Sequence, residues 1–124
     1  MNDRDIHLTN DAVQLHCPEY GKYEPGNKIS FKDFETFLRN EKQVEFREVV
    51  LPKIKDTIRD TMIALWNKLQ SLQETTQMKS ILNQFELFGY DFMIDEEVNV
   101  YFIEVNTNPC LDTSPCPLLN RVIT

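Results

Sequence analysis

Three polar residues in one short stretch of the sequence have the types that could hold a metal ion. Asp91 lies in an apolar run at 86–94, and Glu104 and Asn106 lie in the next run, at 100–106. Both runs have the alternation and the aromatic and β-branched content of strands, and strand interiors disfavour Asp and Asn. The two runs predict a β-hairpin in which these three residues require a chemical explanation.

Alternation along a strand decides which side chains share a face. If the two wholly apolar sets cover the same core, the turn needs an even number of residues, most simply 95–98. The same match places Asp91, Glu104 and Asn106 together on the other face, where Gly89 leaves space. The apolar sets are Phe88, Tyr90, Phe92 and Ile94 in the first strand and Tyr101, Ile103 and Val105 in the second, with Val100 and Phe102 expected on the polar face.

A shared site for two carboxylates has an electrostatic cost that a cation removes. Two carboxylates about 4 Å apart repel by roughly 4 kcal/mol at an effective dielectric near 20. Mg²⁺ takes oxygen ligands at about 2.1 Å and usually keeps water or phosphate oxygens in its remaining positions. The pattern therefore indicates a site for a Mg²⁺–nucleotide complex, with a solvated hairpin face as the alternative.

Helices are the elements expected to support this hairpin. Ser30 is a candidate N-cap for a short helix, with Asp33 in the place of the capping-box acid. A longer helix is predicted over 46–72, and Pro52 either starts this helix or kinks it. We interpret the phenylalanines of the short helix and Trp66 of the long helix as core residues, without a cofactor role.

Irregular segments surround these elements. Residues 16–29 contain two of the six prolines and two of the three glycines, which is typical of a long loop. Residues 5–13 are interpreted as a short strand or loop. Ser114 could cap a last helix with Pro115 at its first position. The order helix, helix, hairpin, helix indicates an α+β fold.

Composition narrows the class of protein. The chain has 124 residues, 41% of them hydrophobic, which suits one compact unit with a core. Its formal net charge of −7 argues against nucleic-acid binding, and no run is apolar enough to span a membrane. Cys17, Cys110 and Cys116 form no CxxC pair, so reduced thiols are expected rather than disulfides or a structural zinc site.

Two segments resemble the tubulin–tyrosine ligase-like family, which belongs to the ATP-grasp superfamily. They are "FELFGYDFMIDEEVNVYFIEVNTNPCL" at 85–111 and "HLTN" at 7–10. The resemblance implies an incomplete ATP-grasp C-terminal lobe, in which an antiparallel hairpin packs against helices. Residues 1–124 would be the C-terminal part of the catalytic domain, because the family's N-terminal and nucleotide-binding central lobes precede the tetrad. Asp11 departs from the aromatic residue more often expected after it, which leaves the branch of the family open.

The resemblance also implies a reaction and the residues that serve it. Family members use ATP to join tyrosine, glutamate or glycine to a carboxylate of tubulin or another acidic protein, through an acyl phosphate. The implied metal ligands are Asp91, Glu104 and Asn106, with Glu104 as the catalytic residue that bridges two Mg²⁺ ions. The implied nucleotide-binding residues are His7, Leu8, Thr9, Asn10 and Ile103, the last in the adenine pocket.

The implied partners are ATP, a free amino acid, and tubulin or another glutamate-rich protein tail, with no nucleic acid and no membrane. The expected setting is the cytoplasm and the microtubule cytoskeleton, with cilia among the candidates. A non-catalytic microtubule-binding or scaffold module that keeps the fold is the main alternative, and the presence of all three metal ligands argues against it. A ligase for a small-molecule carboxylate is a weaker alternative, which "HLTN" disfavours. The added amino acid is left open, and the isolated chain is expected to lack ligase activity.

Overall fold

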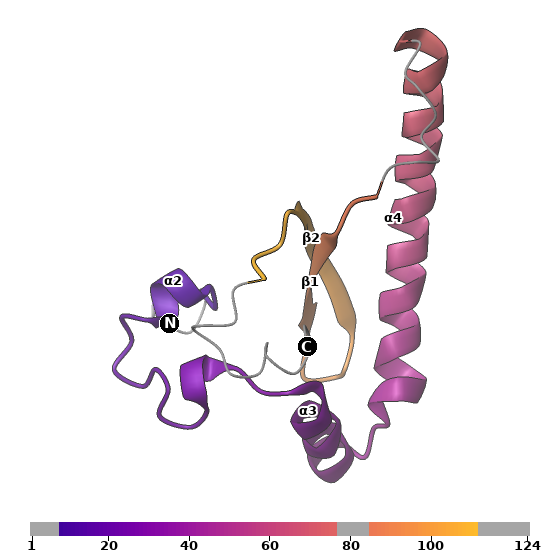
Figure 1. Cartoon of the computed structure of the whole chain (residues 1–124). Coiled ribbons are helices and arrows are strands. Elements are labelled where there is room, and N and C mark those ends of the chain that lie inside the picture. The colour runs from indigo at the N-terminus through magenta and orange to yellow at the C-terminus, as the bar shows by residue number, and fades with distance from the viewer. Residues whose placement is uncertain (1–7, 77–84, 112–124) are drawn as a thin grey trace. The chain divides into compact units, whose positions relative to one another are not determined.

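The computed structural model describes residues 8–76 and 85–111 (Figure 1). Contacts divide the chain into two compact units, Met1–Phe37 with Leu111–Thr124, and Leu38–Cys110. This division differs from the single unit that composition predicted. The described elements are helical in the first unit, whereas the second combines helices with a two-stranded antiparallel sheet. The fold is therefore α+β, as the sequence predicted.

The described part of the first unit contains three short helical elements. They are α2 (Asp11–Gln14), the 3₁₀ turn η1 (Pro25–Asn27) and α3 (Phe31–Phe37). The helix α2 occupies a segment for which a strand or loop was predicted. The predicted cap of α3 is confirmed, since Ser30 Oγ accepts the Asp33 N–H at 3.1 Å and donates to the Asp33 carboxylate at 2.6 Å.

Local polar contacts close the irregular loop between α2 and α3. The carboxylate of Asp11 accepts a hydrogen bond from the Tyr20 hydroxyl at 2.9 Å and lies 3.3 Å from Lys28 Nζ. These two contacts, the Tyr20 hydrogen bond first, lower the pKa of Asp11 from its ordinary value. The Asn27 side chain accepts the Gly21 N–H at 2.8 Å. The Asp11 side chain thus serves the loop of its own unit.

The second unit is built from a long helix and the hairpin. Its described elements are the π-helical turn η2 (Leu38–Lys42), α4 (Phe46–Thr76), β1 (Phe88–Ile94) and β2 (Val100–Thr107). The helix α4 begins ahead of Pro52 and continues through it, so Pro52 does not start the helix. Because proline has no N–H, one intrahelical hydrogen bond is missing at this position.

The core of the described chain is small and lies in the second unit. Its buried apolar residues are Leu38, Phe46, Val50 and Val98. The prediction that the phenylalanines of α3 and Trp66 are core residues is wrong for most of them: Phe31 is 73% exposed, Phe37 49% and Trp66 44%. Helical periodicity identified an apolar stripe correctly but could not show whether another element covers it.

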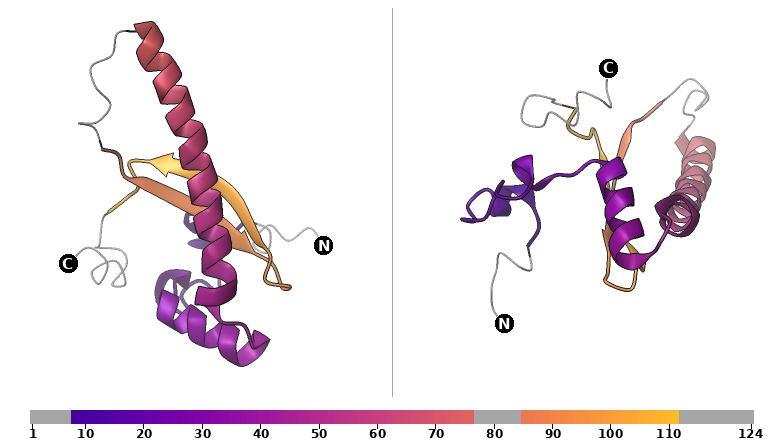
Figure 2. Two further views of the ribbon diagram at one scale, coloured as in Figure 1. Left: turned by 90° about the vertical axis from the view of Figure 1, so that its right-hand side faces the viewer. Right: turned by 90° about the horizontal axis from the view of Figure 1, so that it is seen from below.

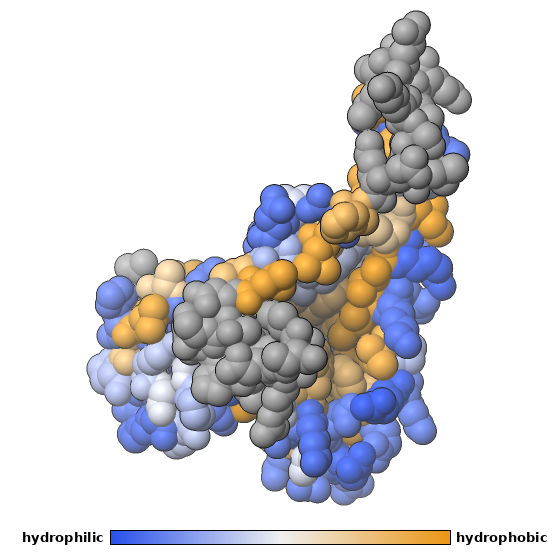
Figure 3. Space-filling view, in the orientation of Figure 1, coloured by the Kyte–Doolittle hydropathy of each residue, from blue (hydrophilic) through white to orange (hydrophobic). Residues whose placement is uncertain are grey.

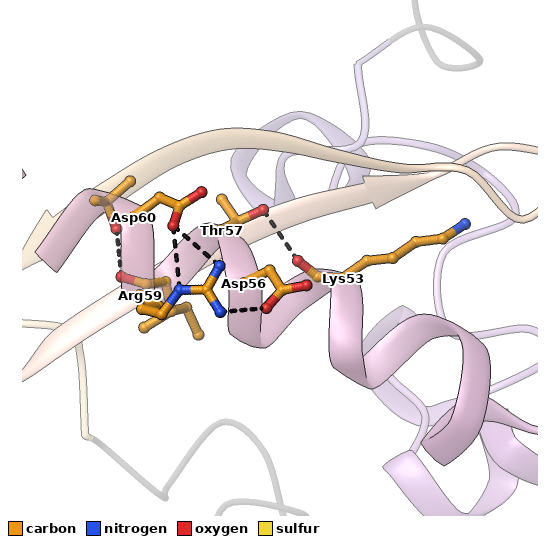
Figure 4. A network of polar contacts seen from close by, with 7 residues as sticks. Lys53, Asp56, Thr57, Arg59 and Asp60 are labelled. Atoms are coloured by element: carbon orange, nitrogen blue, oxygen red, sulfur yellow. Dashed lines mark hydrogen bonds and ion pairs between the residues drawn. The ribbon is translucent and has the colours of Figure 1, made fainter. Parts of the chain in front are cut away.

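The two sides of α4 differ in character. On the polar side, Arg59 donates to Asp56 at 2.8 Å and to Asp60 at 3.2 Å, and Thr57 donates to the Lys53 carbonyl at 3.1 Å (Figure 4). This mixed-charge side is solvated, as predicted. Hydrophobic side chains gather over the hairpin and the adjoining side of α4 (Figure 3). An open groove of about 430 Å³ along the helix is lined by Arg59, Met62, Ile63, Leu65, Trp66 and Leu69.

The remaining sequence predictions concern a membrane span, the cysteines and residues near the two ends of the chain. Within 8–76 and 85–111, no helix combines the length and hydropathy that a bilayer-spanning segment requires. Cys17 and Cys110 are free thiols, as expected. Cys116, the last helix predicted from Ser114, and His7 lie outside the described residues.

Candidate metal and nucleotide site

The hairpin brings the three predicted metal ligands to one face of the sheet. β1 and β2 pair antiparallel, with Asp91 opposite Glu104 and Gly89 opposite Asn106. Directly opposite residues of an antiparallel pair point to the same side, as do alternate residues of one strand. Asp91, Glu104 and Asn106 therefore share a face, which confirms the predicted geometry. Their role as metal ligands stays a prediction.

A one-residue irregularity in β2 changes how this arrangement is reached. Ile94 pairs with Val100, which leaves the turn 95–99, odd in number rather than even as predicted. The register then shifts next to Asp91, and Ile103 is passed over, as in a β-bulge. The odd turn shifts β2 by one residue and the unpaired Ile103 shifts it by one more, so Glu104 faces the same side as Asp91, as it would after an even turn without a bulge. The polar residues therefore meet by a route that the sequence did not predict.

The bulge reverses the predicted faces in the half of β2 nearest the turn. Phe102 and Val100 lie on the aromatic face, whereas the sequence placed them on the polar face. The ring centroid of Phe102 lies 5.8 Å from that of Tyr90 and 5.8 Å from that of Phe92. Tyr101 lies on the polar face, whereas the sequence placed it on the apolar face, because its partner Met93 is on the polar face with Asp91. Strict period-two alternation fails here because one residue is inserted without a partner.

The aromatic face is the one that α4 covers. Helix α4 lies across the hairpin (Figure 2), and the Tyr90 hydroxyl and Thr61 Oγ1 are 2.7 Å apart. Since α4 occupies the aromatic side, the polar face is directed away from the helix. Asp91, Glu104 and Asn106 are all exposed. A ligand could therefore reach the polar face of the second unit without displacing α4.

The electrostatics of the polar face are unbalanced. Asp91 and Glu104 are like charges directly opposite each other, an arrangement that destabilises a strand pair. Among the ion pairs of the described residues, none joins a lysine or arginine to either carboxylate. Asn106 Nδ2 donates to Glu104 Oε1 at 3.2 Å, which leaves Oδ1 as the atom that a cation would use. Within the described ranges, the two negative charges of this face are therefore not balanced by an ion pair.

The donor set fits a hard divalent cation such as Mg²⁺. Two carboxylates and an amide carbonyl offer only oxygen atoms, which Mg²⁺ prefers over nitrogen and sulfur. The described part of the chain has no group of three or more His, Cys, Asp or Glu side chains suited to a metal. A cation held by two carboxylates and one amide therefore needs further oxygens from water or phosphate, and Mg²⁺ commonly binds in this way.

The comparison with protein families matches the whole chain. The model described as "Tubulin-tyrosine ligase family" covers residues 1–124. The chain belongs to the tubulin-tyrosine ligase family. This membership accounts for both sequence segments that carried the resemblance, the tetrad at 7–10 and the hairpin segment at 85–111.

Curated members of the tubulin-tyrosine ligase family align with most of this chain. Tubulin glycylase 3D of Tetrahymena thermophila is 34% identical over 118 residues, which are 92% of this chain and 10% of that protein. Probable tubulin polyglutamylase TTLL9 of Rattus norvegicus is 33% identical over 115 residues, 92% of this chain and 23% of that protein. The chain thus spans less than a quarter of the length of these two relatives.

The family tetrad lies in the first unit, and its described residues are held next to α2. The Leu8 carbonyl accepts a hydrogen bond from Gln14 Nε2 at 2.6 Å. The Asn10 carbonyl accepts two backbone N–H groups of α2, at 2.9 and 3.0 Å. Thr9 is exposed. The nucleotide-binding role of these residues stays a prediction, as does that of Ile103, which is 54% exposed at the bulge.

Sequence reasoning missed the residue that shapes the turn of this family hairpin. The Asp95 carboxylate accepts N–H groups of Glu97 and Asn99 at 3.1 and 2.7 Å, the Asn99 side-chain amide at 3.0 Å and the Tyr101 hydroxyl at 3.0 Å. These bonds, the Asn99 side chain first, lower the pKa of Asp95. An aspartate at the start of a turn is a known signal for this type of contact, and it could have indicated the role of Asp95.

Proposed function

We propose that this chain supplies the Mg²⁺-binding part of an ATP-dependent ligase. The ligase joins an amino acid to a carboxylate of tubulin or of another glutamate-rich protein tail. Membership of the tubulin-tyrosine ligase family supports this reaction class. The names of the glycylase and polyglutamylase relatives support tubulin as the acceptor, and they leave glycine, glutamate and tyrosine open as the added residue.

The observation that carries the proposal is the cross-strand pair of Asp91 and Glu104. Two exposed carboxylates face each other beside the amide of Asn106, and no basic side chain in the described ranges neutralises them. A structural hairpin gains nothing from such a pair, because like charges weaken it. A cation-binding site requires it.

Each residue has a distinct role in the proposed reaction. Glu104 lies between Asp91, across the strand pair, and Asn106, two residues along the same strand. The resemblance to the family implies that Glu104 would bridge two ions when they are bound. When bound, Mg²⁺ neutralises charge on the phosphate oxygens of ATP. The protein residues hold the triphosphate so that the acceptor carboxylate attacks the γ-phosphorus and ADP leaves. The amine of the amino acid then attacks the acyl phosphate, and inorganic phosphate departs.

The setting of this reaction is part of the proposal. A tubulin-directed ligase acts where its substrate is, in the cytoplasm on the microtubule cytoskeleton, cilia included. The 124-residue chain contains the hairpin and the tetrad but spans a small fraction of its relatives. We therefore expect no ligation from residues 1–124 alone, and ligation only when they are joined to the other lobes of the family's catalytic domain.

The test measures ADP formation and peptide mass for residues 1–124 joined to the remaining lobes of a family member, using ATP, a tubulin C-terminal tail peptide and each of the three amino acids in turn. We expect one amino acid to extend the peptide, and Glu104→Gln to reduce the rate by at least about 100-fold while the fold is kept. Glu97→Gln removes an exposed carboxylate at the other end of the hairpin and serves as the matched control. Full activity of Glu104→Gln would contradict the proposal. Microtubule binding without ADP formation by the wild type would instead indicate the scaffold alternative.

A further inference from the structure

Gly89 lies on the polar face of the hairpin, at a position where another residue leaves little room for a side chain. Its backbone is outside the left-handed region, so no conformational demand requires glycine there. A Cβ atom added to Gly89 would lie 3.1 Å from Cβ and 3.9 Å from Cγ of Pro109. The first distance is shorter than ordinary van der Waals contact. The Pro109 ring therefore occupies the space that a side chain at position 89 would need.

The chain reaches this position by a sharp change of direction after β2. β2 ends at Thr107, and Asn108 adopts the left-handed conformation with φ +52°, which asparagine tolerates better than most residues. Pro109 follows, with its φ fixed by the ring. The segment after the strand is thus turned back against β1 and held there by a rigid side chain.

This contact lies next to Asn106 both across the strand pair and along the chain. Asn106 is the cross-strand partner of Gly89, and it precedes Pro109 by three residues. A displacement of Pro109 would therefore move the end of β2 that carries the Asn106 amide. The hydrogen bond from Asn106 Nδ2 to Glu104 Oε1 has a length of 3.2 Å, and a modest shift of the backbone would break it.

We propose that Gly89 and Pro109 are positioning residues for the Mg²⁺–nucleotide site, because their close contact fixes the end of β2 and thereby directs the Asn106 amide oxygen at the cation. This inference rests on the proposed function, since it assigns the contact to that same site. Neither residue touches the metal or the nucleotide in this scheme. Residues that orient a metal ligand commonly affect metal affinity by about 10- to 100-fold.

A double-mutant cycle measures this contact directly. Mn²⁺, which takes the same oxygen ligands as Mg²⁺, is titrated in the presence of ATP into residues 1–124 joined to the remaining lobes of a family member, and free Mn²⁺ is followed by electron paramagnetic resonance. The variants are Gly89→Ala, Pro109→Gly and the two combined. Thr107→Ala is the matched control, because it changes an exposed residue between Asn106 and Asn108 on the other face of the strand.

We expect Gly89→Ala to weaken Mn²⁺ binding about tenfold, and Pro109→Gly to weaken it about tenfold as well. In the combined variant the added methyl group has room, so the loss should stay near tenfold rather than reach 100-fold. Thr107→Ala should bind Mn²⁺ as the wild type does. Circular dichroism reports whether each variant is folded, and if Gly89→Ala is not, Pro109→Gly alone tests the role of the ring.

Two results would overturn the positioning role. One is wild-type Mn²⁺ affinity in a folded Gly89→Ala or Pro109→Gly variant, and the other is an additive loss of about 100-fold in the combined variant. Absence of ATP-dependent Mn²⁺ binding by the wild-type protein would refute the proposed function itself. The failure of the contact and the failure of the site are thus separate outcomes.

Discussion

The two ends of the hairpin are opposite in character. At the turn, Val98 is 6% exposed, and Lys42 and Lys53 donate hydrogen bonds to backbone carbonyls of the turn at 2.9 and 3.3 Å. Midway along the strands and beyond the bulge, the cross-strand pair of Asp91 and Glu104 is exposed and repulsive, and Asn106 follows toward the open end. The turn is anchored by hydrogen bonds from η2 and α4, and the half of the hairpin beyond the bulge carries charges that no described ion pair balances.

This difference indicates which end serves stability and which serves binding. The Asp95 carboxylate accepts hydrogen bonds from three donors of the turn and from the Tyr101 hydroxyl of β2. The buried Val98 has a left-handed φ of +64°, a costly conformation for a β-branched residue. A well-anchored turn lets the hairpin keep a repulsive pair beyond the bulge. Local conflicts of this kind are expected at functional sites.

The largest expected effect comes from breaking the anchored end. Val98→Asp places an unpaired charge among the buried residues of the second unit and should reduce the free energy of unfolding by about 3–5 kcal/mol, measured by urea unfolding. Val49→Asp is the matched control, because Val49 is 39% exposed on α4, and it should cost less than about 1 kcal/mol. Equal losses in the two variants would show that the turn is not an anchor.

A smaller effect is expected at the bulge, where Ile103 is the predicted adenine contact. Ile103→Ala should weaken ATP binding about five- to tenfold, if the side chain contacts adenine, because an apolar contact is lost. Its free energy of unfolding should change little, since Ile103 is 54% exposed. Ile63→Ala, at an isoleucine of α4 that is 52% exposed, should leave ATP affinity unchanged in the same calorimetric titration. Equal ATP affinity in both variants would remove Ile103 from the nucleotide site.

The smallest expected effect concerns acid stability at the turn. The pKa of Asp95 is lowered in the folded chain from its ordinary value of 3.8. The charged carboxylate therefore stabilises the folded state fully when the pH is above 3.8. This stabilisation is lost as the pH falls below 3.8 toward the lower folded pKa. Asp95→Asn should therefore be less stable near neutral pH and show a weaker decline in its urea midpoint below pH 3.8 than the wild type. Glu96→Gln, in the same turn, should keep the wild-type decline, and an identical decline in Asp95→Asn would contradict this role.

The sequence was sufficient for the features that depend on local pattern. The Ser30 cap, the long helix after residue 46 and both strands follow from periodicity and end signals, and they are present in the structure. The shared face of Asp91 and Glu104 was also predicted. Hydrophobic alternation constrains strand register strongly when one face is buried.

The remaining features depend on events that alternation does not encode. A single extra residue at Ile103 exchanged the faces of Phe102 and Tyr101, and its presence becomes visible only when the two strands are paired. Val98 is one of the buried core residues of its unit, although its neighbours in sequence are the polar residues of a turn and do not indicate burial. The closeness of Gly89 to Pro109 depends on the conformation of the intervening chain, which spacing alone cannot give.

The most direct test of the metal site is the free energy of unfolding of the wild type and of Glu104→Gln, each measured with and without Mg²⁺ and ATP. Without metal, Glu104→Gln should be more stable than the wild type by roughly 0.5 kcal/mol, because a like-charge pair is removed. With Mg²⁺–ATP at about 100 times its Kd, the wild type should gain about 2.7 kcal/mol and Glu104→Gln far less. A Glu104→Gln variant that is less stable without metal and gains as much as the wild type with Mg²⁺–ATP would contradict a cation site on this face.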